Sequence, residues 1–331
     1  MRGAVIGTVV GLLVYAGLVL WADLDGVRAA IAALSPRTLL EATGLVLAGY
    51  VLRFARWELY RVRVGREVPA LLGLTRLRSG LVFLAGLALT VSPGKLGEAF
   101  KSILLKEEVG APVSRTAPMV LAERLTDLLA LLLLIGLANA SAASAHGWVL
   151  PVALGLSGGA LAVLLSPRLG GMALAVLGAM GPLARLRPRA EQALGSTRAL
   201  LAPGLLLGAL VLGTGAWTLE CIAAWRLASG LGLPAPEFAP VVAAFALSLV
   251  AGAVALFTPG GLGVTEGLLT EQLRRRYLEG GAAAEVARAG AASATLLTRL
   301  LTLWFAVGLG LVGLALHRRG VGRRPAADQA A

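Results

Sequence analysis

Two short segments of this sequence combine a proline and a glycine with a nearby glutamate, and both could contribute to an anion site. Ser92-Pro93-Gly94-Lys95-Leu96-Gly97 is followed directly by Glu98, and Thr258-Pro259-Gly260-Gly261-Leu262-Gly263 is followed three residues later by Glu266. Proline has no backbone N–H and glycine has no Cβ, so we expect each segment to break a helix. A helix that starts after such a break directs free N–H groups and a partial positive charge outward, which suits a phosphate.

The charged residues of these segments have two possible roles. The chain's three lysines, Lys95, Lys101 and Lys106, all lie in or shortly after the first segment, and the first two would add positive charge beside a bound phosphate. Alternatively, they extend from a half-helix to the cytoplasmic surface. Glu98 and Glu266 would contact a polar headgroup or carry a proton that drives transport, because a carboxylate inside a membrane usually faces protein or water. Alternatively, they only complement the helix dipole.

A third charged motif precedes a leucine-rich run. Glu123 and Asp127 are four residues apart and share a helix face, while Arg124 and Asp127 are spaced to form an ion pair. An interfacial salt bridge is the alternative to a substrate contact. Arg299 occupies a comparable place later in the chain, with no carboxylate beside it in the sequence. Further candidates are Arg53 and Arg56, which end one apolar run, and Glu220, which lies inside another.

Composition predicts a polytopic membrane protein. Of the 331 residues, 57% are hydrophobic and 15% are charged, and the mean hydropathy is +0.82, whereas soluble domains carry about 25% charged residues. This excludes a soluble enzyme, a disordered chain and a disulfide scaffold. The single cysteine and the lack of metal-binding, nucleotide-binding or hydrolase motifs predict no metal, no cofactor and no recognised catalytic group.

The net charge of +12 reflects membrane topology. Arginines cluster in 53–78, 168–198 and 318–324, each beside an apolar run. This positive-inside pattern predicts contact with anionic lipids, not with nucleic acid. Both termini and these segments are expected in the cytoplasm, and 139–147, which has no formal charge, outside. Segment 271–290 would also lie outside, although it contains four arginines.

The Pro-Gly motif repeats at an offset of 166 residues, and Tyr50-Val-Leu-Arg53 parallels Trp217-Thr-Leu-Glu220 at an offset of 167. We expect an all-α integral membrane bundle of two inverted repeats, about 1–140 and 148–316, within one domain, 1–316. Each half would contain three spans and one re-entrant Pro-Gly hairpin, and 317–331 would be a basic, disordered cytoplasmic tail. Broken helices in inverted repeats usually mark a transporter's substrate site. The alternative is an old duplication kept only for packing.

The Pro-Gly segments together with Glu123-Arg124-x-x-Asp127 resemble the lysylphosphatidylglycerol synthase transmembrane region, a flippase-like family, over roughly residues 5–316. In bifunctional relatives, this region moves an aminoacylated lipid that a separate soluble domain makes. The sequence shows no such domain, so the resemblance implies no synthase activity here and a possible separate lipid-synthesising partner.

We therefore expect translocation of a lipid, or of a lipid-linked polar headgroup, across the bacterial cytoplasmic membrane. One alternative is a proton-coupled transporter of a small polar solute that uses Glu98 or Glu266. Another is an intramembrane lipid-modifying transferase or an accessory subunit. A lateral opening toward lipid would favour translocation, whereas two carboxylates beside a nucleophile would favour an enzyme.

Overall fold

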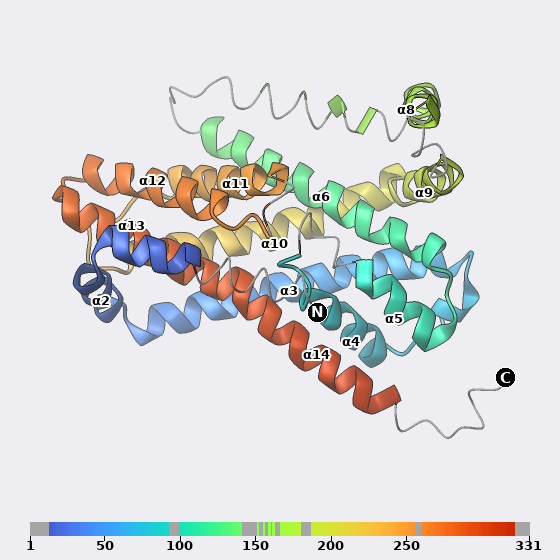
Figure 1. The fold of residues 1–331 in the computed structure, drawn as a ribbon, viewed down its shortest axis with the longest axis horizontal. Helices are drawn as coiled ribbons and strands as arrows, with labels where there is room; N and C mark the ends of the chain where they lie inside the picture. Colours follow the sequence, from blue (N-terminus) through green and yellow to red (C-terminus); the bar gives the residue numbers. More distant parts are fainter. Residues whose placement is uncertain are drawn as a thin grey trace.

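The protein is helical throughout the described part of the chain (Figure 1). The computed structural model describes residues 13–92, 99–140, 151, 155, 158–159, 161–162, 166–179, 187–255, 258 and 260–321. After an apolar helix over Leu13–Ala22, the elements are α2 (Leu24–Ala33), α3 (Pro36–Gly65), the short 3₁₀ helix η1 (Pro69–Leu71), α4 (Arg76–Leu87), α5 (Phe100–Val109), α6 (Val113–Ala140), α8 (Pro167–Ala179), α9 (Arg187–Leu200), α10 (Pro203–Ser229), α11 (Phe238–Val254), α12 (Val264–Glu279), α13 (Ala284–Arg299), the π-helix η4 (Leu300–Trp304) and α14 (Phe305–Val321).

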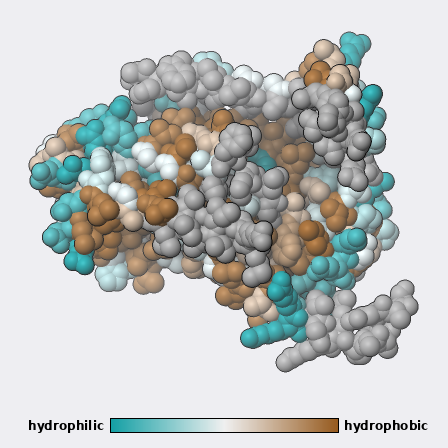
Figure 2. All heavy atoms as spheres, in the orientation of Figure 1, coloured by the Kyte–Doolittle hydropathy of each residue, from teal (hydrophilic) through white to brown (hydrophobic). Residues whose placement is uncertain are grey.

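Three continuous helices among the described residues are long and apolar enough to cross a membrane: α3, α10 and the unbroken run Ala284–Arg319. The 30 residues of α3 extend about 45 Å, which exceeds a hydrocarbon core of about 30 Å. Helix α6 has 28 residues but carries Glu123, Arg124 and Asp127 midway. Figure 2 shows hydrophobic residues across the middle of the visible face and hydrophilic residues toward both ends of the long axis. The predicted all-α, multi-pass membrane class is therefore confirmed.

The bundle has two ends that differ in their elements. One end contains the C-terminal part of α3, the start of α4 and the basic last turn of α14, with Arg318 and Arg319; we call it the basic end. The other end contains α2, the start of α3 and the connection between α12 and α13; we call it the α2 end. At the α2 end, the arginines of segment 271–290 are largely matched: Arg274 and Arg275 both pair with Glu271, and Arg276 pairs with Glu279.

Helices α3 and α10 run side by side in opposite directions through the centre of the bundle (Figure 1). A Cβ added to Gly49 on α3 would lie 3.3 Å from the carbonyl oxygen of Ala216 on α10. Small residues allow helix backbones to approach in this way in membranes, where dispersion and polar contacts replace the hydrophobic effect between helices. The approach brings the polar residues of both helices into one central region.

The turns associated with the two Pro-Gly motifs meet in that region. A Cβ at Gly260 would lie 3.3 Å from the Cα of Val91. Val91 also packs in one buried cluster with Leu262 of the second motif and Leu303 of η4. Gly260, Gly261 and Gly263 have φ of 63°, 74° and 88°, which explains why the second motif contains glycine at these positions. Residues 93–98 and 259 lie outside the described part of the chain.

Two features differ from the simplest interpretation of the sequence. The segment 53–78, expected as a cytoplasmic loop, is helical as far as Gly65, and Arg53 and Arg56 within it are buried. Their helix continues because carboxylates on neighbouring helices compensate both charges. The start of the tail expected to be disordered, 317–321, is the helical end of α14. The rest of that tail and most of segment 139–147 lie outside the described residues, so the expectations for these parts stay predictions.

Two glycines of α14 allow a direct test of the packing between α14 and α4. A Cβ at Gly310 would overlap the backbone of Ala88, whereas a Cβ at Gly308 would meet nothing within 4 Å. We expect Gly310→Ala to destabilise the protein by about 1–3 kcal/mol, as overpacking does, and Gly308→Ala to leave it unchanged. Thermal unfolding in detergent measures both, and equal melting temperatures would contradict this packing.

Candidate functional site

A small cavity lies where the central helices and the two turns converge. Its volume is about 70 Å³, which is room for a few water molecules and less than the roughly 300–1,000 Å³ of typical ligand pockets. Its lining includes side chains from α3, α6, α10, α13 and η4 together with residues near the first turn: Tyr50, Arg53, Leu87, Thr90, Arg124, Asp127, Trp217, Glu220, Leu249, Arg299, Thr302, Leu303 and Ala306.

The first buried ion pair of the cavity joins α3 to α10. Arg53 donates a hydrogen bond to Glu220, and both side chains are buried. The Arg53 guanidinium also lies 4.4 Å from the ring centroid of Trp217, as a cation–π contact. Tyr50 extends the network by donating a 2.9 Å hydrogen bond to the carbonyl oxygen of Thr302. The pair thus fixes the register of α3 relative to α10, which runs beside it in the opposite direction.

Asp127 on α6 is the second centre of the network. Arg56 lies 2.8 Å and Arg124 2.9 Å from its carboxylate oxygens, and Trp217 Nε1 donates a 3.1 Å hydrogen bond to Oδ1. The expected Arg124–Asp127 pair is therefore present. Arg124 differs from Arg56 in exposure: its side chain is 31% exposed, against 1% for Arg56. Of these two arginines, Arg124 is the one that an incoming molecule can reach.

Arg299 on α13 forms the third buried pair, with Glu266 on α12. Its Nε lies 2.6 Å from Glu266 Oε1, and a second nitrogen donates a 3.2 Å hydrogen bond to the carbonyl oxygen of Gly260. Glu266 also accepts a 2.7 Å hydrogen bond from the backbone N–H of Gly263, so it caps α12. Arg299 has no carboxylate beside it in sequence, but the fold brings one to it from the second Pro-Gly motif.

Lys101 and Glu123 form a separate buried pair between α5 and α6. The Lys101 ammonium lies 4.8 Å from the ring centroid of Trp57, and neither partner lines the central cavity. Glu123 and Asp127 thus share a helix but bind different cations. The charge of Lys101 is already compensated by Glu123, so Lys101 is not free to hold a phosphate in this arrangement.

The charged lining favours an anion. Three arginines, Arg53, Arg124 and Arg299, face two carboxylates, Asp127 and Glu220, so the lining has a formal net charge of +1 (three minus two). The hydroxyl oxygen of Thr90 in the same lining is buried, with no hydrogen-bond partner among the described residues. Arginine forks are suited to two-point contact with phosphate oxygens. No group of His, Cys, Asp and Glu in the described chain is arranged to hold a metal ion.

The structure brings most of the described candidate residues together. Arg53, Arg124, Asp127, Glu220 and Arg299 line the cavity, while Arg56, Gly260, Gly261, Gly263 and Glu266 lie in the network or turn beside it. Six candidates lie outside the described residues: Pro93, Gly94, Lys95, Gly97, Glu98 and Pro259.

Sequence reasoning did not identify four other polar or aromatic residues of the lining: Tyr50, Thr90, Trp217 and Thr302. Tyr50 and Trp217 occupy matching positions of the sequence repeat, and this was the signal that could have identified them.

The Arg53–Glu220 pair predicts a large loss of stability when one partner is neutralised. Glu220→Gln leaves the buried Arg53 charge uncompensated, which typically costs about 3–5 kcal/mol. The pair between Glu41 and Arg226 provides a matched control, because it joins the same two helices with side chains that are 32% and 40% exposed. Glu41→Gln should cost less than about 1 kcal/mol. Reversible unfolding in mixed micelles measures both, and equal losses would show that burial does not distinguish the two pairs.

Comparison with known proteins agrees with the membrane architecture. Residues 8–310 match the family model described as the lysylphosphatidylglycerol synthase TM region. No curated protein matches the chain. The family connects the protein with lipid modification or translocation. Because the match covers most of the sequence, including the central network, the chain belongs to the lysylphosphatidylglycerol synthase TM region family.

Proposed function

We propose that the protein moves a phosphate-bearing lipid, or a lipid-linked polar molecule, between the leaflets of the cytoplasmic membrane. The observation that carries this proposal is the presence of three arginines around one cavity between membrane-spanning helices. Ionisable residues at membrane depth are costly and usually mark a path for a polar substrate. The arginines would hold the phosphate of the headgroup while the acyl chains stay in lipid.

An inverted repeat explains why corresponding helices of the two halves have corresponding packing partners. The helices that precede the two Pro-Gly motifs pack against spans of the opposite half, since α4 packs against α14 and α11 against α6. The helices that follow the motifs pack in their own halves, α5 against α6 and α12 against α13. Arg53 and Glu220, at matching repeat positions, contact each other, as expected for residues close to a pseudo-twofold axis. These relations support the proposed duplication.

Each half has an ion pair between the helix after its Pro-Gly motif and the next helix, and the positive and negative residues of the two pairs exchange places. The helix after the first motif carries the cation of its ion pair, Lys101, and its partner on α6 is Glu123. The helix after the second motif carries the anion, Glu266, and its partner on α13 is Arg299. The two halves would therefore contribute differently to a headgroup site, because only the second pair places its cation, Arg299, in the cavity lining.

The short helices around the motifs are consistent with re-entrant hairpins. Helices α4, α5, α11 and α12 have 10 to 17 residues, which corresponds to about 15–26 Å and is less than a hydrocarbon core of about 30 Å. In this proposal, α4 and α5 enter from the basic end, and α11 and α12 enter from the α2 end. Their turns meet at Val91 and Gly260, beside the cavity.

The cavity of about 70 Å³ is too small for a phospholipid headgroup, so we assign the structure to an occluded state. Separation of one hairpin from the spans it packs against would open the arginines toward one leaflet. Separation of the other hairpin would open them toward the opposite leaflet. This is the alternating-access scheme found in transporters built from inverted repeats.

The distribution of charge suggests the orientation. The basic end carries the clustered arginines and would face the cytoplasm, so both termini would be cytoplasmic. The arginines at 274–276 lie at the end that would face outward, so a count of arginines alone argues against this orientation. Their pairing with Glu271 and Glu279 lowers the net charge of that segment and reduces the conflict.

Arg124→Lys tests the function most directly. Lysine keeps the charge and the pairing with Asp127 but loses the planar fork that binds phosphate at two points. We expect the rate of lipid translocation in reconstituted liposomes to fall about tenfold or more, with little change in melting temperature.

Arg115→Lys is the matched control, because Arg115 lies on the same helix at the surface and pairs with Glu67 at 3.2 Å. A wild-type rate for Arg124→Lys, measured with a fluorescent phospholipid, would leave Arg124 as a structural ion-pair partner only.

A further inference from the structure

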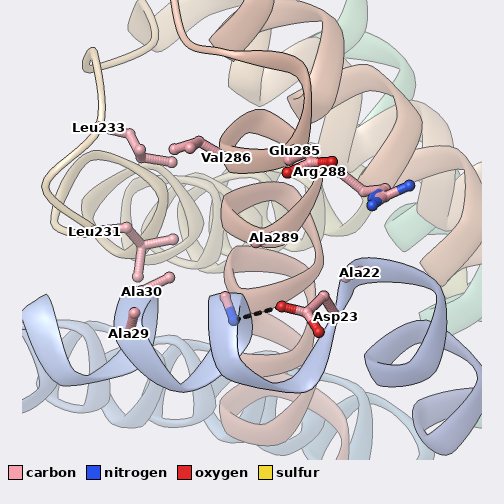
Figure 3. Close-up of a pocket in the computed structure, with 11 residues that line it drawn as sticks. Ala22, Asp23, Ala29, Ala30, Leu231, Leu233, Glu285, Val286, Arg288 and Ala289 are labelled. Atoms are coloured by element: carbon pink, nitrogen blue, oxygen red, sulfur yellow. Dashed lines mark hydrogen bonds between the residues drawn. The ribbon is translucent and has the colours of Figure 1, made fainter.

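A second, larger cavity lies at the α2 end of the bundle, separate from the central network (Figure 3). Its volume is about 600 Å³, within the range of roughly 300–1,000 Å³ for small-molecule sites. Helix α2, the first turns of α13 and the connection after α10 form its walls. It shares no lining residue with the central cavity.

The lining of this α2-end cavity is divided into an apolar half and a charged half. Figure 3 shows Ala30, Leu231, Leu233 and Val286 together on one side. Asp23, Glu285 and Arg288 lie toward the other side. A molecule that fits such a lining has a charged portion joined to an apolar one, as a phospholipid has where its headgroup meets its acyl chains.

The side chains of the charged half are available to bind a ligand. The side chains of Glu285 and Arg288 form no hydrogen bond or ion pair with any described residue, and the buried Nε of Arg288 is among the atoms without a partner. Asp23 accepts one hydrogen bond, from the Gly26 N–H at 3.1 Å, and a carboxylate can accept several. Asp23 also has φ of 72°, the only positive φ of a non-glycine residue in the described chain. Such backbone strain is found preferentially at functional sites.

The surroundings of the cavity suit a membrane interface. Trp21, which is 46% exposed, lies next to it, with the Arg288 guanidinium 5.6 Å from its ring centroid. Leu20 and Leu24 beside Trp21 are also exposed. Tryptophan is enriched at the level of lipid headgroups, where one part of the ring contacts apolar chains and another contacts water.

We propose that the α2-end cavity binds the headgroup of a zwitterionic phospholipid that carries a primary ammonium group. The ammonium would lie between Asp23 and Glu285, and the phosphate would contact Arg288. Two carboxylates and one arginine give the lining a formal net charge of −1, so an anionic headgroup without an amine would bind less well. The inference deepens the proposed translocation by assigning a lipid class and a second site on the path, and it rests on that function for its role but not for its binding.

Binding can be tested without transport. The full-length protein, purified in detergent, is mixed with equal amounts of phosphatidylethanolamine and phosphatidylglycerol, and native mass spectrometry counts the lipids retained. We expect several-fold preference for phosphatidylethanolamine. Glu285→Gln removes one ammonium partner, and we expect it to weaken this retention about tenfold.

Two further variants separate binding from folding. Ala30→Trp fills the apolar half without altering any charge, and it should reduce retention of both lipids at this site. Glu279 is an exposed glutamate at the same end of the molecule, and its side chain pairs with Arg276. The Glu279→Gln variant should retain phosphatidylethanolamine as the wild type does.

Equal retention of the two lipids by the wild type would overturn the inference. Unchanged retention in both Glu285→Gln and Ala30→Trp would also overturn it. Selective binding in a protein that moves no lipid in liposomes would instead overturn the proposed function and leave this site standing.

Discussion

The ion pair between Arg53 and Glu220 is the constraint on which the centre of this structure depends. Both groups lie on helices that are long and apolar enough to cross a membrane, and an uncompensated charge within a membrane is expensive. The pair can form only if α3 and α10 pack closely in this antiparallel register, which Gly49 and Ala216 permit.

The other buried charges follow the same rule. Arg56 and Asp127 connect α3 to α6, Glu266 and Arg299 connect α12 to α13, and Lys101 and Glu123 connect α5 to α6. Each pair joins an element to one that it must contact, so pairing of charge specifies the arrangement of helices that are otherwise similarly apolar. A bundle held in this way can also rearrange, because an anionic ligand can compensate an arginine that loses its carboxylate partner.

The sequence allowed prediction of the helical membrane class, because composition and apolar runs are direct consequences of the lipid environment. It also allowed prediction of most described residues of the candidate site, since charges within apolar runs are conspicuous.

The sequence could not identify the ion-pair partners of these residues. The carboxylate of Glu266 reaches Arg299 from 33 residues away, and nothing local to Arg299 indicates this. The continuation of α3 through Arg53 and Arg56 was missed for the same reason: the compensating acids are distant in the chain. The α2-end cavity is formed by three segments that have no shared motif.

The two cavities suggest a division of roles along one path. The central cavity presents three arginines to a phosphate but is too small for a headgroup in this state. The α2-end cavity is large, and in our proposal its carboxylates discriminate between headgroups by their amines. Selection at the membrane surface and transfer through the centre would then depend on different residues. Substitutions in one cavity should therefore change which lipid is bound without changing the phosphate contacts of the other.

The central claim is that the two turns at Val91 and Gly260 must separate for a lipid headgroup to pass. A disulfide between Val91→Cys and Leu262→Cys tests it in a Cys221→Ala background, because both side chains belong to one buried cluster between the two turns. Leu262 is preferred to Gly260, since the φ of 63° at Gly260 strains any residue with a Cβ. Lipid translocation is measured in liposomes before and after reduction, with each single cysteine variant as a control. The account predicts that the oxidised protein is inactive and that reduction restores its activity. Undiminished translocation by a fully cross-linked protein would contradict it.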